Sequence, residues 1–130
     1  MRISAYIYTA LILFLASACS DEENGITVKA DLKNARLRGV VKHHNAIIPM
    51  AKVYLKNHTS EFPGMNTFIY SDSTTSDKDG FYQFIELSVG NHYLFFVGFD
   101  SSINETVFGG IPVTIKVWGE NIVADVPLTE

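Results

Sequence analysis

The sequence is short of cysteine, positive charge and long apolar runs. Cys19 is the only cysteine among the 130 residues, so the chain cannot form an internal disulfide. If Cys19 is modified, no thiolate remains for a metal site or for nucleophilic catalysis. Lys and Arg number 10 against 14 Asp and Glu. This balance excludes nucleic acid as a partner, because phosphate recognition needs a basic face.

The main apolar run, residues 10–15, is far below the about 20 residues that a membrane-spanning helix needs. Arg2 precedes it, and the small residues 16–18 separate it from Cys19. This order is typical of a bacterial lipoprotein signal, although Ala16 stands where such signals usually carry leucine. We expect residues 1–18 to be a signal peptide, and Cys19 to carry acyl chains such as palmitate that anchor the protein to a membrane. An ordinary secretory signal that is cut nearby is the alternative.

The residues after Cys19 indicate where the anchor lies. Ser20, Asp21, Glu22 and Glu23 resemble the export signal that sends lipoproteins to the outer face of the outer membrane in one Gram-negative phylum. A flexible, acidic tether with no sorting role is the alternative. We expect a lipid-anchored protein of the outer membrane that faces the cell exterior, with the periplasmic face as the other location.

The remaining chain is long enough for one domain. We assign residues 19–34 to an acidic tether and residues 35–130 to a single folded unit. Removal of the signal takes away Arg2 and leaves 9 basic and 14 acidic residues, a net charge of −5. That charge argues against electrostatic adhesion to anionic lipid and leaves membrane contact to the acyl chains.

Short apolar segments separated by turn residues predict an all-β fold. Residues 35–41 and 50–56 alternate between apolar and polar, as strands with one buried face do. Residues 93–99 are continuously apolar, which indicates a central strand that is covered on both sides. Residues 67–76 predict an exposed strand, and residues 81–85 a buried one. We expect about seven strands in a single Greek-key β-sandwich.

Several of these segments also follow the order of a known family. The chain is similar to the carboxypeptidase regulatory-like domain, a prealbumin-like (transthyretin-like) sandwich, over residues 35–99 and more loosely over residues 113–128. The resemblance rests on Gly39-Val40-Val41, Ile48 to Leu55, Thr74 to Phe84 with its Asp79-Gly80 turn, and Gly90 to Leu94. It implies the fold and a non-catalytic accessory, adhesive or docking role. Glycine at position 80 suits a turn that needs positive φ, and we expect Phe81 and Phe84 to pack inside.

No catalytic site is expected. A hydroxyisourate hydrolase of this fold class uses histidines and a C-terminal motif, but this chain ends without that motif, at Val126 to Glu130. His43, His44, His58 and His92 show no spacing that places an imidazole beside an orienting carboxylate. We therefore expect no enzyme activity and no cofactor.

The sequence does not favour a metal site or a self-formed isopeptide crosslink. Asp72, Asp77 and Asp79 lack the further ligands of a calcium loop. His43 and His44 are expected to point to opposite faces of a strand, so no metal site is expected. An isopeptide between Lys42 and Asn121 beside Glu86 is disfavoured, because Lys42 lies on the polar face and Asn121 in a turn.

Two binding roles remain. The first is docking on an outer-membrane protein partner through a free sheet edge. The second is binding of a glycan by exposed aromatic rings, for which Tyr70 and Trp118 are the chosen contacts and Tyr54, Phe68 and Tyr82 the other candidates. Rings gathered on one face would favour the glycan, a bare apolar patch or free edge would favour docking, and a pocketed histidine–carboxylate pair would favour a hydrolase. Asp72-Ser73-Thr74 also resembles a bacterial O-glycosylation motif at Ser73.

Overall fold

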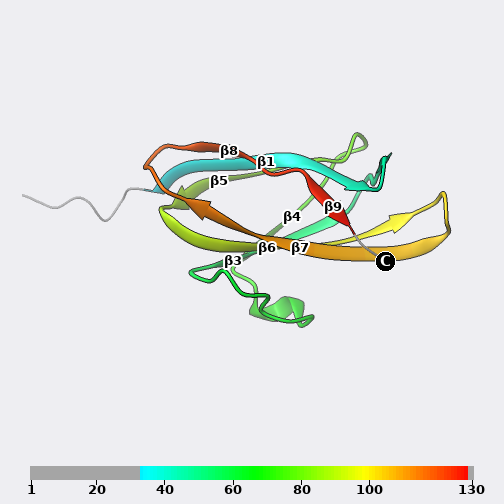
Figure 1. Ribbon diagram of the computed structural model, residues 1–130, viewed down its shortest axis with the longest axis horizontal. Coiled ribbons are helices and arrows are strands. Elements are labelled where there is room, and N and C mark those ends of the chain that lie inside the picture. The colour runs from blue at the N-terminus through cyan, green and yellow to red at the C-terminus, as the bar shows by residue number, and fades with distance from the viewer. Residues whose placement is uncertain (1–32, 129–130) are drawn as a thin grey trace, which may run out of the picture. The chain divides into compact units, whose positions relative to one another are not determined.

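The computed structural model describes residues 33–128. Cys19 and residues 20–23, with the expected lipidation and export signal, lie outside this part of the chain. The described residues form an all-β sandwich of two sheets, as the sequence predicts (Figure 1). Its strands are β1 (Lys33–His43), β2 (Ala46–Ile47), β3 (Lys52–Asn57), β4 (Asp72–Thr75), β5 (Phe81–Ser88), β6 (Gly90–Asp100), β7 (Glu105–Ile115), β8 (Asn121–Val123) and β9 (Val126–Leu128).

The first sheet is built around β1. β5 pairs antiparallel with one side of β1, and the two-residue β2 continues that side at the end of β1. β8 pairs parallel with the first half of β1, and β9 pairs parallel with the second half. β8 and β9, the last two strands, therefore both pair with β1, the first strand.

The second sheet has the order β4-β3-β6-β7. β6 is central in this sheet and pairs antiparallel with β3 and with β7. Leu94, Phe95 and Phe96 follow one another in β6, and each is at most 1% exposed. The expectation of a central strand covered on both sides is confirmed.

The space between the sheets holds the hydrophobic core. Alternate residues of each strand point inward, and burial of these side chains is the main source of stability in a sandwich. Tyr82 lies in this core, and its hydroxyl donates to the buried carbonyl of Ala124. Members of the core include Ala35, Leu37, Val41, Ile48, Ala51, Val53, Leu55, Phe84, Leu87, Leu94, Phe96, Val107, Val113 and Ile115.

The inward residues of β5 differ from the prediction, and the strand contains a bulge after Phe84. Phe84 is buried as predicted, but Phe81 is 39% exposed, and Tyr82 occupies the inward position. On β1 the step from Leu37 to Ala35 spans two residues, whereas the paired step on β5 from Phe84 to Leu87 spans three. The extra residue lets Phe84 and Leu87 both face the core. The prediction that Phe81 packs inside was wrong, because alternate residues of a strand face opposite sides.

Residues 67–76 do not form one strand. Residues Thr67–Ile69 form a single 3₁₀ turn that is capped by Asn66, and only Asp72–Thr75 pair as a strand. The predicted turn before β5 is confirmed. Gly80 has a φ of 78°, and the carboxylate of Asp77 accepts hydrogen bonds from the amides of Asp79 and Phe81.

Candidate functional site

The outer face of the second sheet, which points away from the core, carries a row of aromatic residues. Tyr54 of β3 lies directly opposite Phe95 of β6, which lies opposite Gly110 of β7. These positions alternate with the inward residues Val53, Leu55 and Leu94, so the two rings point outward. Phe95 is nevertheless only 1% exposed and does not belong to the core between the sheets.

The chain from residue 58 to residue 71 covers Phe95. It leaves the end of β3, passes over the outer face and returns as β4, so that the 3₁₀ turn hangs outside the sandwich (Figure 1). The ring centroid of Phe62 is 5.4 Å from that of Phe95, and that of Tyr70 is 5.8 Å from it. Together with Tyr54, Tyr93 and Phe108, these residues form what we call the outer aromatic cluster.

Hydrogen bonds tie this loop to β3 and join residues within it. The Lys56 ammonium donates to the carbonyl of Ile69 at 2.7 Å, and the Tyr70 hydroxyl donates to the carbonyl of Gly64 at 2.9 Å. Partial burial, and then the neighbouring Tyr93, raise the pKa of Tyr70 to about 12. Tyr70 is therefore neutral at physiological pH, and its hydroxyl is already used within the protein.

Two hollows open on this face. One, of about 150 Å³, is lined by apolar groups of Phe62, Tyr93, Phe95, Phe108, Gly109 and Gly110. The other, of about 310 Å³, is lined by Tyr54, Thr67, Tyr70, Ser71, Asp72 and Ser73 and is mainly polar. The stacked rings of Tyr54, Tyr70 and Phe95 lie between them. The face thus offers flat apolar surfaces beside hydroxyl and carboxylate groups.

Gly110 keeps the apolar hollow open. A Cβ atom at this position would lie 2.7 Å from a ring carbon of Tyr93 and 2.5 Å from the carbonyl oxygen of Leu94. Any other residue would displace the Tyr93 ring from the wall of the hollow. Glycine at position 110 therefore has a local structural reason.

The two ring residues chosen from the sequence lie in different places. Tyr70 is half-buried inside the outer aromatic cluster, whereas Trp118 is 52% exposed in the connection from β7 to β8. Gly110, which lies in the row of Tyr54 and Phe95, is separated from the end of β7 at Ile115 by about 17 Å of strand. The structure does not bring Tyr70 and Trp118 together.

Sequence reasoning missed the rings of the outer aromatic cluster that have the most accessible surface. Phe62 and Phe108 are 49% and 43% exposed and line the apolar hollow, while Tyr82, a candidate from the sequence, is fully buried. The alternation in β7 between buried Val107 and Val113 and exposed Phe108 could have indicated an outward ring. No sequence signal places Phe62, because its position depends on the path of the loop.

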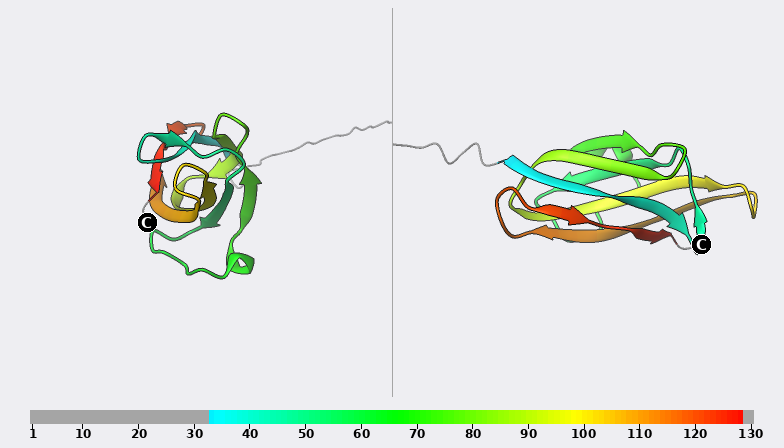
Figure 2. Two further views of the ribbon diagram at one scale, coloured as in Figure 1. Left: turned by 90° about the vertical axis from the view of Figure 1, so that its right-hand side faces the viewer. Right: turned by 90° about the horizontal axis from the view of Figure 1, so that it is seen from above.

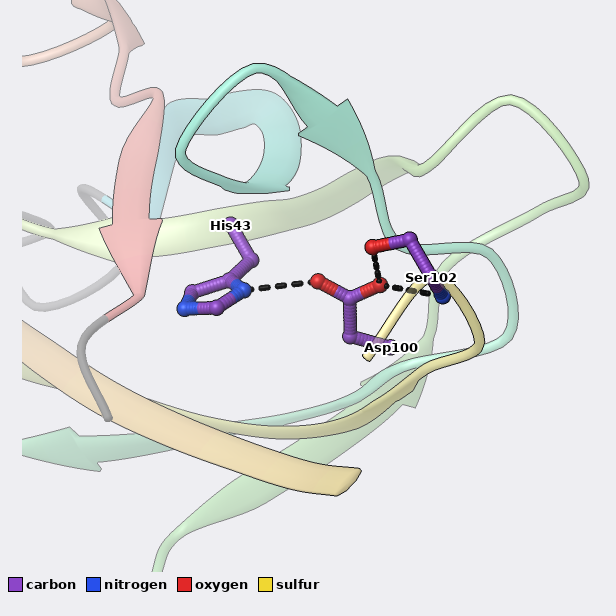
Figure 3. A network of polar contacts seen from close by, with 3 residues as sticks. All are labelled: His43, Asp100 and Ser102. Carbon is purple, nitrogen blue, oxygen red and sulfur yellow. Dashed lines mark hydrogen bonds and ion pairs between the residues drawn. The ribbon is translucent and has the colours of Figure 1, made fainter. Parts of the chain in front are cut away.

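His43, Asp100 and Ser102 form a separate network of polar contacts inside the sandwich (Figure 3). Nδ1 of His43 lies 2.7 Å from one carboxylate oxygen of Asp100, and the other oxygen accepts hydrogen bonds from the amide and hydroxyl of Ser102. The hydrogen bonds from Ser102, and then the one from His43, lower the pKa of Asp100 to about 2. The sequence did not predict this pair, because its members are 57 residues apart.

The pair resembles the base and orienting acid of a hydrolase, but its surroundings differ. His43 is 1% exposed and Asp100 3% exposed, so substrate has no access to the imidazole. Nε2 of His43 has no hydrogen-bond partner among the described residues. Ser102 bonds the carboxylate rather than the imidazole, so it is not placed as a nucleophile that His43 could activate.

The other histidines have local structural roles or lie at the surface. His92 is buried, with its ring nitrogens 2.9 Å from the side-chain oxygen of Asn57 and the carbonyl of Ser88. Burial is the main cause that lowers its pKa. The expectation that His43 and His44 point apart was wrong. His44 leaves the strand with a φ of 55°, so the two ring centroids lie 4.3 Å apart.

The described residues contain no group of three or more His, Cys, Asp or Glu side chains that could hold a metal ion.

The two residues considered for an isopeptide bond, Lys42 and Asn121, are far apart. Asn121 begins β8 rather than lying in a turn, and it pairs with Arg36, six residues before the exposed Lys42 on β1. Six strand residues span about 20 Å, too far for an amide bond. Within residues 33–128, no helix is long and apolar enough to cross a membrane.

No protein-family model and no curated protein sequence matches the chain. Among solved structures, the fold is similar to that of a Pseudomonas aeruginosa protein proposed to bind carbohydrate. The identity is 17%, the TM-score is 0.44, and the match covers 77% of this chain and 90% of that one. A 9R-lipoxygenase from Cyanothece matches with 15% identity and a TM-score of 0.42, over 84% of this chain and 19% of the enzyme. Both likenesses are distant.

Proposed function

We propose that this protein is a non-catalytic, lipid-anchored module that binds a glycan on the outer aromatic cluster. The observation that carries the proposal is the gathering of six aromatic rings on one sheet face, with an apolar and a polar hollow on either side of the central stack. The resemblance to carboxypeptidase regulatory-like domains agrees with a binding role rather than a catalytic one.

The chemistry of the face suits a sugar ring. One side of a pyranose presents C–H groups that pack on an aromatic ring, and its edge presents hydroxyls that need hydrogen-bond partners. Phe62 and Phe108 supply half-exposed rings, and Asp72, Ser71 and Ser73 supply oxygen atoms in the neighbouring hollow. Because Asp72 and the net charge of −5 of the mature chain repel anions, we expect a neutral or amino-bearing glycan rather than an acidic one.

Arrayed neutral and amino-bearing oligosaccharides, probed with the full-length mature protein, would test this proposal. We expect Phe108→Ala to weaken binding to the captured glycan by about tenfold or more, which corresponds to about 1.4 kcal/mol. Phe81→Ala is the matched control, because Phe81 is equally half-exposed (39% against 43%) but lies on the other sheet. No capture of any glycan, or equal losses from the two variants, would rule the proposal out.

The lipid anchor is a separate part of the proposal and needs its own test. The signal pattern that ends at Cys19, and the acidic residues 20–23 after it, support acylation and display on the outer membrane. Cells fed a radiolabelled fatty acid should label the wild type but not Cys19→Ser. Protease added to intact cells should then degrade the protein if it faces the exterior, and should spare it if it faces the periplasm.

Docking on an outer-membrane protein is the second candidate function. The loop over the outer face carries two exposed apolar side chains, Phe68, which is 95% exposed, and Met65, which is 57% exposed. Crosslinking on intact cells, followed by identification of the bound protein, would test this role. A defined partner that is lost in Phe68→Ser would favour docking, and recovery of the protein alone would favour the glycan.

A further inference from the structure

Three segments of the sandwich meet at the end where β1 begins. Lys33 of β1 pairs with Ser88, so the turn from β5 to β6 lies at this end. Ile115 at the end of β7 pairs with Gly90 of the same turn, and Asn121 at the start of β8 pairs with Arg36. Figures 1 and 2 show the β7–β8 connection and the β5–β6 turn beside the first residues of β1. We call this the tether end.

The tips of the tether end are apolar. Val89 in the β5–β6 turn is 46% exposed, and Val117 and Trp118 in the β7–β8 connection are 62% and 52% exposed. Surface turns usually carry polar residues, and neighbouring exposed apolar tips mark a contact surface. Trp118 is the only tryptophan of the chain.

Trp118 is held in place by its own turn. The carboxylate of Glu120 accepts from the amides of Lys116 at 2.8 Å and Val117 at 3.4 Å, and the amide of Glu120 donates to the carbonyl of Val117 at 3.1 Å. The amide of Arg36 donates to the carbonyl of Glu120 at 2.8 Å, which ties the turn to β1. The turn is therefore ordered before any contact forms, which lowers the entropic cost of that contact.

Lys33, the first residue that the structure describes, lies at this end, so the preceding chain joins the sandwich here. If Cys19 carries the acyl chains, residues 20–32 alone separate the anchor from β1. Thirteen residues span at most about 45 Å when fully extended. The tether end is then the part of the sandwich that the shortest stretch of chain joins to the anchor.

We propose that the tether end docks on the headgroup interface of a phospholipid bilayer through Trp118, Val117 and Val89. The inference rests on the lipid anchor of the proposed function. An indole suits this interface, because its ring is apolar and its N–H group can reach water or a headgroup. Two neighbouring valines add apolar contact area without any charge to dehydrate.

Charge contributes little to this contact. Arg36 and Lys116 are exposed near this end, but so is the carboxylate of Glu86, and the carboxylate of Glu120 is held by backbone amides. We therefore expect docking on zwitterionic as well as anionic lipid and weak dependence on salt. The strands run away from this end, so the outer aromatic cluster stays open to a glycan while the anchor holds the protein.

The single tryptophan reports the contact directly. The mature, acylated protein is reconstituted into phosphatidylcholine vesicles, with brominated phosphatidylcholine as the quencher in the membrane and acrylamide as the quencher in water. We expect Trp118 emission to shift to shorter wavelength, to lose intensity with brominated lipid and to be shielded from acrylamide. Val117→Asp should reverse all three effects, while the protein stays with the vesicles.

A matched probe on another surface serves as the control. Phe68→Trp combined with Trp118→Phe moves the indole to the exposed tip of the outer-face loop, where brominated lipid should not quench it. Acylated protein that remains with the vesicles while Trp118 behaves like this control would overturn the docking and leave the anchor intact. Protein that carries no acyl group by mass spectrometry, and that does not bind vesicles, would remove the anchor and with it the inference.

Discussion

At the scale of single residues, Phe95 is an outward-facing side chain that is buried all the same. It faces away from the core, yet Phe62, Tyr54 and Tyr70 leave it 1% exposed. The outer aromatic cluster therefore has two roles. Its centre holds the loop on the sheet, and only its rim, Phe62 and Phe108, offers substantial ring surface to a ligand.

Tyr82 provides a test of a single buried hydrogen bond. Its hydroxyl donates to the carbonyl of Ala124 and so joins β5 to the C-terminal segment. Burial, and then the charge of Asp125, raise the pKa of Tyr82. Tyr82→Phe leaves that buried carbonyl without its donor and should lower the free energy of unfolding by about 1–3 kcal/mol in urea titrations. Tyr54→Phe, at a half-buried site, is the control and should change it much less.

Substitution of Glu86 can test whether the backbone conformation at the β5 bulge is strained. It has a φ of 60°, a left-handed conformation that a residue with a Cβ adopts at a cost. Glu86→Gly should therefore raise the free energy of unfolding by about 0.5–1 kcal/mol. Gln83→Gly, at a regular exposed position of the same strand, should lower it by about as much. Losses of equal size at both sites would contradict this account of the bulge.

At the scale of elements, the loop of residues 58–71 has its own attachment to the sheet. Phe62 packs on Tyr93 and Phe95, and Lys56 bonds the carbonyl of Ile69. These contacts are separate from the core between the sheets. We expect the loop to open without unfolding of the sandwich, as segments with few buried contacts do.

Hydrogen exchange can measure this independence. Phe62→Ala should speed amide exchange roughly tenfold within residues 58–71 and leave β3 and β6 unchanged, because only the loop attachment is lost. Phe68→Ala is the control, since its ring is 95% exposed and packs on little. Faster exchange throughout the sandwich in Phe62→Ala would show that the cluster belongs to the global core.

At the scale of the whole molecule, His43 and Asp100 link the two sheets. His43 lies on β1 of the first sheet and Asp100 at the end of β6 of the second, with a 2.7 Å contact between them. The link lies at the end of the sandwich opposite the tether end. This polar contact adds to the apolar packing between the two sheets.

Acid should weaken this link. The folded pKa of Asp100 is about 2 against an ordinary value of 3.8, so the unfolded chain binds more protons between these values. The stabilising effect is complete above pH about 4 and is lost as the pH falls towards about 2. We expect Asp100→Asn to lower the melting temperature at neutral pH, and the difference from wild type to shrink near pH 2. Asp79→Asn, at an exposed site, should show little difference at either pH.

The local sequence was enough to predict the strands and the turn before β5. Alternation in residues 35–41, the apolar run of residues 93–99 and the glycine at position 80 depend on neighbours along the chain, so the all-β sandwich and its central strand could be expected. The prediction of one strand over residues 67–76 was wrong, because their Ser and Thr content suits both a strand and a loop.

The binding face was decided by tertiary structure. The outer aromatic cluster joins Phe62 to Phe108, and the link between the sheets joins His43 to Asp100, and no periodicity connects residues so far apart in the sequence. The bulge at Glu86 places Leu87 on the core face together with Phe84, which alternation alone could not indicate. Side-chain type and local period set which segments become strands, whereas the path of a loop and the pairing of distant strands set which side chains meet.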